Sequence, residues 1–206
     1  GEVVPLPPQR FQPNILPGNP LYFIKTLGRE IRALVTLDPE KDAKLRLRYA
    51  NEKILEINLL VDRGRPERAA EHLKSYVRDL EKVSQATAVL EERDAKAAQK
   101  LFEKTAKNEL QHQILIGKLE REAPIGKAVE VKETREKALE QLSKAVEHFD
   151  TQKIEQVLSV AINNNGSPFK SLRNLEVLKY LEEKVSEQAK EVIQRAQENS
   201  LERFAN

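Results

Sequence analysis

The sequence predicts an all-α protein, a bundle of about six amphipathic helices of which some are long. Charged residues make up 33% of the chain and hydrophobic residues 39%, whereas aromatic residues make up only 5%. Only 7 glycines are present in 206 residues, and a sheet protein needs more turn, β-branched and aromatic residues than this. Leu, Val, Ile and Ala instead recur at helical spacing between wide charged faces, which is typical of helices that pack around a common core.

The N-terminal segment has a different composition. Six of the 10 prolines lie within the first 20 residues, and proline removes a backbone donor and clashes with the preceding helical turn. We therefore expect residues 1–18 to form a Pro-rich extended arm or linker and residues 19–206 to form the helical bundle. Two interpretations of the arm remain open: it spaces the domain from a surface, or it packs on the domain through Leu6, Phe11 and Ile15.

The first two helices have matching start signals, Asn19-Pro20 and Asp38-Pro39. Asn and Asp cap helices well, and proline is favoured at the first helical position. The second helix should end at Gly64, because glycine is common just after a helix end. The apolar face of the first helix comprises Leu21, Ile24, Leu27, Ile31 and Leu34. That of the second comprises Leu45, Leu47, Tyr49, Ala50, Ile54, Ile57 and Val61.

A third, long helix should begin near Pro66. Its apolar pattern runs from Ala69 to Thr87 and resumes from Ala98 to Leu119. The intervening Glu-Glu-Arg-Asp sequence of residues 91–94 is too polar for a core on any face, so we expect exposure, a kink or a break there.

Three more helices follow in the sequence. One should run from about Gly126 to Phe149, and the next, capped by Asp150 or Thr151, should end at Ile162 before the strong breaker Asn163–Gly166. The sixth helix carries apolar residues at alternating steps of three and four, which favours packing along a partner helix. We expect this sixth helix to contact a protein partner or a second copy. Its apolar residues are Leu175, Leu178, Leu181, Val185, Ala189, Val192 and Ala196.

The charge pattern argues against nucleic-acid binding. The 35 basic and 33 acidic residues nearly cancel to a net charge of +2, and nucleic-acid binders usually gather a basic excess on one face. The basic residues Lys41, Lys44, Arg46 and Arg48 stand among acidic neighbours and lack an aromatic platform for bases. We therefore expect them to form an ordinary solvated surface.

Composition also bears on the compartment. The chain contains no Cys and no Met, and the missing Met predicts a processed or truncated start, such as a cleaved signal peptide or an expression scar. No apolar run approaches the ~20 residues of a transmembrane helix. We expect an extracytoplasmic protein, secreted or at the cell surface after removal of a signal peptide, without a transmembrane segment in this chain.

The candidate metal ligands are Glu109 and His112. They lie three residues apart on one predicted helix face, and ferritin-like carboxylate proteins use two such Glu-x-x-His motifs with two further Glu residues. This chain has one copy, so a site would have to recruit His72 and His148 from other helices. The alternative is that His112 is a partly buried residue with a hydrogen-bonding neighbour, since buried polar groups need partners.

No catalytic motif emerges from the sequence. There is no Cys nucleophile, the serines lack a glycine-framed elbow, and no glycine-rich loop suited to phosphate is present. We expect no enzymatic activity and no cofactor.

Five stretches of the sequence form a recognisable pattern: Ile15–Phe23, Leu37–Lys41, Arg48–Lys53, Asn174–Leu178 and Glu187–Ile193. Together they resemble the DUF5667 family, a helical domain of unknown function from bacterial and archaeal proteins. The resemblance covers roughly residues 15–205 and implies an extracytoplasmic location, because family members typically carry a signal peptide or anchor, a Pro-rich spacer and then this domain. It implies no activity, and Asn174 stands where members often have a His.

Two hypotheses of function follow. The first is an extracytoplasmic structural or interaction module that presents helix faces to a protein or envelope partner. The alternative is a helical bundle that binds a metal or small ligand through Glu109 and His112.

Overall fold

The computed structural model describes residues 15–17, 19, 22–162, 168–185 and 187–205. Within these ranges the ordered elements are α-helices and none is a strand, which confirms the all-α fold. The helices are α1 (Tyr22–Leu34), α2 (Pro39–Asp62), α3 (Pro66–Glu91), α4 (Ala95–Glu122), α5 (Ile125–Val146), α6 (Thr151–Ile162), α7 (Pro168–Lys184) and α8 (Glu187–Ala205).

Eight helices in the described part of the chain replace the predicted six because two long segments are divided. The predicted third helix breaks at its charged stretch: α3 ends at Glu91, and the side chain of Asp94 accepts a hydrogen bond of 2.9 Å from the backbone of Ala97 at the start of α4. The predicted sixth helix is divided into α7 and α8, which pack against each other.

Two of the predicted helix boundaries, at Asp38 and Gly64, are confirmed by their caps, whereas α5 ends at Val146 and not at Phe149. Asp38 accepts from the backbone N–H of Lys41 at 3.1 Å and so begins α2. Gly64 has φ +67°, a conformation that favours glycine, and lets the backbone of Arg65 donate to Leu60 O at 2.8 Å. The breaker at 163–166 lies outside the described residues.

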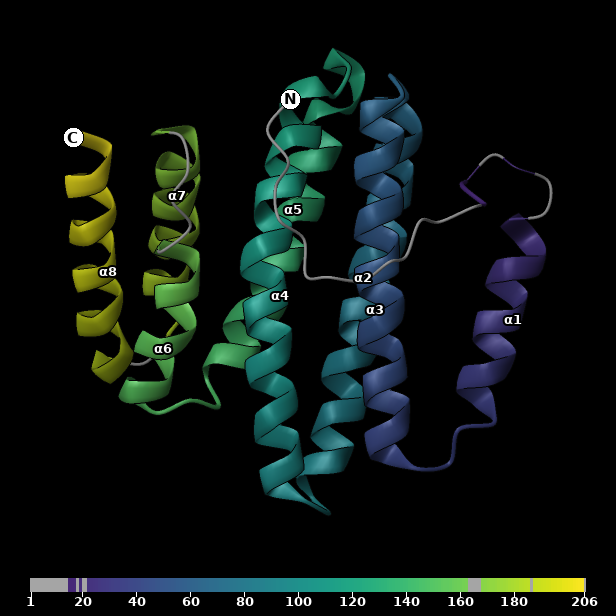
Figure 1. The fold of residues 1–206 in the computed structure, drawn as a ribbon, viewed down its shortest axis with the longest axis horizontal. Helices are drawn as coiled ribbons and strands as arrows, with labels where there is room; N and C mark the ends of the chain where they lie inside the picture. The colour runs from purple at the N-terminus through teal and green to yellow at the C-terminus, as the bar shows by residue number, and fades with distance from the viewer. Residues whose placement is uncertain (1–14, 18, 20–21, 163–167, 186, 206) are drawn as a thin grey trace.

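The helices form a broad assembly in which α2–α5 make a central bundle, α6–α8 lie on one side and α1 lies at the opposite edge (Figure 1). One core cluster joins α2 and α3 to the second half of α4 and to α5. A second cluster joins the first half of α4 to α6–α8. None of the described helices is both long and apolar enough to cross a lipid bilayer.

The predicted sixth helix buries six of its apolar residues within the chain: Leu175, Leu178, Leu181, Val185, Val192 and Ala196. Leu178, Leu181 and Val185 of the α7 segment pack in the same core cluster as Val192 and Ala196 of α8. The alternating spacing predicted a partner helix correctly, but that partner is supplied by the fold itself. The expectation that this helix contacts a protein partner or a second copy stays a prediction, and these buried residues lend it no support.

Helix α1 departs from the expectation that its apolar residues face the core. Ile24, Leu27 and Ile31 are 62%, 47% and 53% exposed, whereas Arg29 and Ala33 of the same helix are buried. Helix α1 thus lies on the bundle with its polar face inward.

Most of the Pro-rich arm, residues 1–14 and 18, lies outside the described residues. At its end, Leu16 is buried and Lys25 donates a hydrogen bond of 3.3 Å to the backbone carbonyl of Ile15.

Candidate functional site

Glu109 and His112 come together with Tyr76 in the interior of the bundle. Both α4 residues are buried, and Glu109 Oε1 lies 3.1 Å from His112 Nδ1. Tyr76 reaches them from α3: its hydroxyl donates to Glu109 Oε1 at 2.5 Å and lies 2.8 Å from His112 Nδ1. The tyrosine and histidine rings pack edge to face, with centroids 5.6 Å apart. The sequence-based expectation that these buried polar groups have partners is confirmed.

The charge state of this interior cluster follows from its burial. Burial, together with the neighbouring Glu109 carboxylate, raises the pKa of Tyr76 well above its usual range, so its hydroxyl remains a donor. The second carboxylate oxygen of Glu109, Oε2, is buried and has no hydrogen-bond partner. A buried acceptor without a hydrogen bond lowers the stability of the fold. Glu109 Oε2 is therefore the atom that a small donor group entering the cluster would contact.

A second Tyr-Glu-His cluster of similar geometry fastens α1 to the bundle. Tyr22 of α1 donates to Glu56 Oε2 of α2 at 2.7 Å, and His72 Nε2 of α3 lies 2.8 Å from the same oxygen. The Tyr22 hydroxyl also lies 3.0 Å from His72 Nε2, and the two rings again meet edge to face with centroids 5.6 Å apart. In both clusters, a tyrosine hydroxyl contacts one carboxylate and one imidazole.

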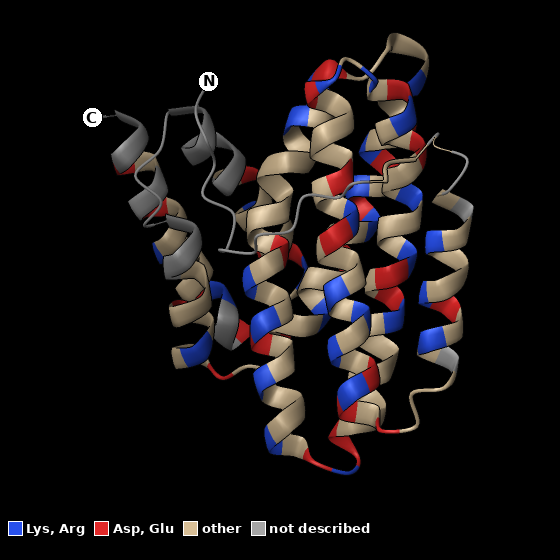
Figure 2. Ribbon diagram, turned by 45° about the vertical axis from the view of Figure 1, so that its right-hand side comes forward, with Lys and Arg blue, Asp and Glu red and all other residues tan. Residues whose placement is uncertain are grey.

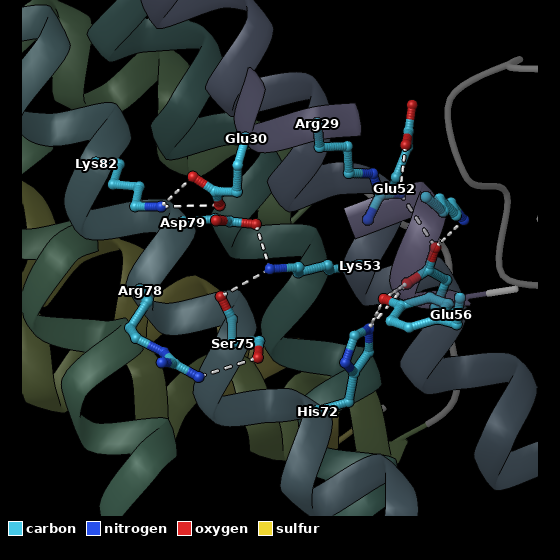
Figure 3. A network of polar contacts seen from close by, with 12 residues as sticks. Arg29, Glu30, Glu52, Lys53, Glu56, His72, Ser75, Arg78, Asp79 and Lys82 are labelled. Atoms are coloured by element: carbon cyan, nitrogen blue, oxygen red, sulfur yellow. Dashed lines mark hydrogen bonds and ion pairs between the residues drawn. The ribbon is translucent and has the colours of Figure 1, made fainter. Parts of the chain in front are cut away.

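The second cluster differs from the first because it contains cations (Figure 3). Lys25 and Arg29, one turn apart on α1, both contact Glu56 Oε1, with Arg29 Nη2 at 3.2 Å. Arg29 Nη2 also lies 2.5 Å from Glu52 Oε2. The network therefore brings three side chains of α1 to one fully buried carboxylate on α2.

The pKa of Glu56 reflects a competition between burial and these partners. Burial alone raises the pKa, but the contacts of His72, Lys25, Arg29 and Tyr22 with the carboxylate lower it to about 2. Burial and the Glu56 carboxylate hold the pKa of Tyr22 above its usual range. Glu56 is accordingly ionised at neutral pH, and the network is an ionic clasp between α1 and α2.

This clasp leaves the apolar face of α1 exposed. Ile24, Leu27 and Ile31 form a row along the helix, and Val35 and Leu37, which follow the helix in sequence, are 69% and 90% exposed. We call these five residues the outer face of α1.

The histidines proposed for a four-residue metal site lie in different places. His72 belongs to the Glu56 cluster. His148 lies on the surface, 3.2 Å from Glu91, with its ring stacked on Phe102 at 3.8 Å between centroids. Across the residues that the structure describes, no three His, Cys, Asp or Glu side chains gather so as to hold a metal ion. Glu109 and His112 are thus brought together, whereas His72 and His148 do not join them.

The basic residues near the start of α2 are mostly paired with acidic neighbours. Arg46 lies 2.9 Å from Asp42, Arg48 lies 3.7 Å from Glu52, and Lys44 contacts Glu40. The expectation of a solvated mixed-charge surface is confirmed here.

Sequence reasoning missed Tyr22, Glu56 and Tyr76 as members of polar clusters. Tyr76 occupies a core position in the apolar pattern of α3, which hides its polar role. The role of Glu56 could have been predicted from its position, because it lies on the buried side of α2 between Ile54 and Ile57. A carboxylate at such a position requires partners from neighbouring helices.

Comparison with known proteins gives one family. Residues 14–125 match the family described as "Domain of unknown function (DUF5667)", and this range includes both Tyr-Glu-His clusters. A search of curated proteins found no match. A solved structure titled "DHF58 filament" is 25% identical in sequence, with 90% of this chain and 95% of that chain covered and a TM-score of 0.27. At that TM-score the likeness carries no argument about fold or assembly.

Proposed function

The chain belongs to the DUF5667 family, a domain of unknown function. We propose that it is an extracytoplasmic interaction module. In this proposal the outer face of α1 receives an apolar helix of a partner protein. The observation that carries it is the orientation of α1, whose polar face is inward and whose apolar face is outward.

The orientation has a definite physical cause. Surface helices normally bury their apolar face, and fully burying a Leu or Ile side chain contributes about 1.5–3 kcal/mol. Rotating α1 to gain that contribution would leave the buried Glu56 without Lys25 and Arg29. Breaking a buried ion pair costs about 3–5 kcal/mol. Ile24, Leu27 and Ile31 are each about half exposed, so burying all three would contribute roughly 2–5 kcal/mol in total, which is no more than the cost of breaking the ion pairs. The contacts of Lys25 and Arg29 with Glu56 therefore oppose the rotation and keep the apolar row at the surface.

The spacing of the row favours a helix as the partner. Ile24, Leu27 and Ile31 recur at each turn, as do the anchor positions in helix-in-groove recognition. Membrane-surface helices set Lys and Arg beside their apolar face, but Lys25 and Arg29 are directed at Glu56 instead.

The extracytoplasmic part of the proposal is supported by the family arrangement and by the prolines that precede α1. Members of the family typically carry a signal peptide or anchor before a Pro-rich spacer. In the proposal the module acts by binding and not by catalysis.

Site-specific photocross-linking in cells tests this function. A photoreactive residue at Leu27 should cross-link to one protein of the cell envelope, within an amphipathic helix identified by mass spectrometry. The matched control is Val129, which is 69% exposed on α5 and should give no such product. A product containing two copies of this chain, equal cross-linking at Val129, or no product would contradict the proposal. Protease accessibility in intact cells tests the location separately.

A second candidate function is binding of a metal or small ligand at Glu109 and His112. It is favoured by one observation, the buried Glu109 Oε2 without a hydrogen-bond partner. Calorimetric titration with Zn²⁺, Cu²⁺ or Fe²⁺ tests it, and Glu109→Gln supplies the control. Binding at micromolar metal that disappears in the variant would support this function, whereas absence of heat in the wild type would reject it.

A further inference from the structure

The first half of α4 carries a row of lysines that the Tyr-Glu-His clusters do not use. Lys96, Lys100 and Lys104 are exposed and four residues apart, so they follow one another along one helix face with about 6 Å between neighbouring Cβ atoms. None of the three forms an ion pair with any residue that the structure describes. Figure 2 shows the succession of basic residues along α4.

The positions of these lysines are unfavourable for the stability of the helix. Helix N-termini favour acidic residues, and like charges four residues apart repel each other. Helix α2 follows the rule with Glu40 and Asp42 in its first turn, whereas α4 has no acidic residue in its first turn and has Lys96 there. Local choices that weaken a helix without compensation inside the fold are expected at binding sites.

The same lysines line a surface hollow of about 430 Å³ between the starts of α2 and α4. Glu40 and Lys44 of α2 and Asp94, the N-cap of α4, also line the hollow. Both carboxylates are engaged, since Glu40 contacts Lys44 and Asp94 accepts from the backbone of Ala97. Four lysines against two carboxylates leave the hollow with an excess of two positive charges.

We propose that this hollow binds an acidic polypeptide segment whose carboxylates are spaced one helical turn apart. The three lysines span about 12 Å along α4, which matches Glu or Asp residues at every fourth position of a helical segment. The hollow shares no lining residue with the outer face of α1, and its proposed role goes beyond the function proposed above.

The lining of the hollow favours a polypeptide over other polyanions. The lining residues include no aromatic side chain on which a nucleic-acid base can stack. The carboxylates of Glu40 and Asp94 would also repel the closely spaced phosphates of a nucleic acid. A flat bilayer reaches the rim of a concave site and not its floor. The apolar side chains of Ala97 and Leu101 also line the hollow and suit the methylene groups of Glu side chains.

Fluorescence anisotropy with the full chain tests the proposal. The probe is a labelled helical peptide with Glu at every fourth position, compared with the same peptide carrying Gln, with anionic phospholipid vesicles and with a single-stranded oligonucleotide. The variant K96Q/K100Q/K104Q should bind the Glu peptide at least tenfold more weakly than the wild type. The control K132Q/K137Q/K179Q removes three other exposed lysines and should bind within twofold of the wild type.

Several results would overturn the proposal: no binding of the Glu peptide, equal loss in both triple variants, or tighter binding to vesicles or the oligonucleotide than to the peptide. Circular dichroism checks that both variants remain helical. Cross-linking at α1 is expected to be unchanged by K96Q/K100Q/K104Q, so failure at one surface can be distinguished from failure at the other.

Discussion

The hydroxyl of Tyr22 donates a hydrogen bond of 2.7 Å to Glu56, a residue 34 positions later in the chain. Tyr76 has the same relationship to Glu109 at 2.5 Å, 33 positions later. The Glu56 cluster joins α1 to the bundle and contains Lys25 and Arg29, whereas the Glu109 cluster lies inside the bundle between α3 and α4. The two clusters therefore make separable predictions, one about the attachment of α1 and the other about the core.

Glu56→Gln should release α1 from the bundle. The substitution removes the charge that Lys25 and Arg29 share, and loss of a buried ionic partner costs about 3–5 kcal/mol. Hydrogen–deuterium exchange should show faster exchange in α1, and urea unfolding should show a lower free energy of unfolding.

Glu30→Gln is the matched control, because Glu30 of α1 forms an exposed pair with Lys82 at 3.1 Å. Exposed pairs contribute about 0–1 kcal/mol. If both variants exchanged α1 at the same rate, the ionic clasp would not be what attaches this helix.

The pKa of Glu56 predicts how stability depends on pH. The carboxyl has a pKa of about 2 in the folded protein against 4.5 without its partners, so its stabilisation is fully present above pH 4.5. As the pH falls from 4.5 to about 2, the unfolded chain takes up a proton that the folded chain does not, and the stabilisation is lost. The difference corresponds to about 3 kcal/mol. Urea unfolding between pH 7 and pH 2 should show this loss, and Glu56→Gln should reduce it; an unchanged slope in the variant would assign the acid sensitivity to other groups.

Tyr76→Phe should destabilise the interior cluster. It removes the donor to Glu109 Oε1 and leaves His112 as the neighbour of that oxygen, and removing one partner of a buried polar group costs about 1–3 kcal/mol. Thermal unfolding measures the change. Tyr180→Phe is the control, since Tyr180 makes a bond of 3.4 Å near the surface to the backbone carbonyl of Glu136. An equal loss of thermal stability in both variants would show that the Tyr76 hydrogen bond contributes no more than a bond near the surface.

Helix boundaries were predictable because their causes are local. Asp38, Gly64 and Asp94 act within a few residues of their own positions, and caps of this kind can be recognised in a sequence. The divided sixth helix was not predictable from its pattern, because the same spacing of apolar residues suits a partner helix from this chain or from another molecule. The fold decides between these by folding α8 back on α7.

The environment of α1 and the polar clusters depend on contacts between distant residues. Apolar spacing identified Ile24, Leu27 and Ile31 as one face of a helix, but the direction of that face is set by Glu56 on another helix. Glu109 and His112 were found because they lie three residues apart, whereas Tyr76 joins them from 33 and 36 positions away. Pairings over such distances leave no periodic pattern in a single sequence.

Leu27→Ala and Leu178→Ala form a pair that tests which apolar rows are buried within the chain. Leu178 is 2% exposed and packs in the core between α4 and α6–α8, so its truncation should lower the free energy of unfolding by about 2–5 kcal/mol. Leu27 is 47% exposed on α1, and substitutions at surface positions away from special features change stability by about 0.5 kcal/mol or less. Urea denaturation of the two variants and the wild type measures both values. A large loss in Leu27→Ala would mean that the outer face of α1 is already covered in the isolated chain, and the partner helix proposed for it would then have no surface to bind.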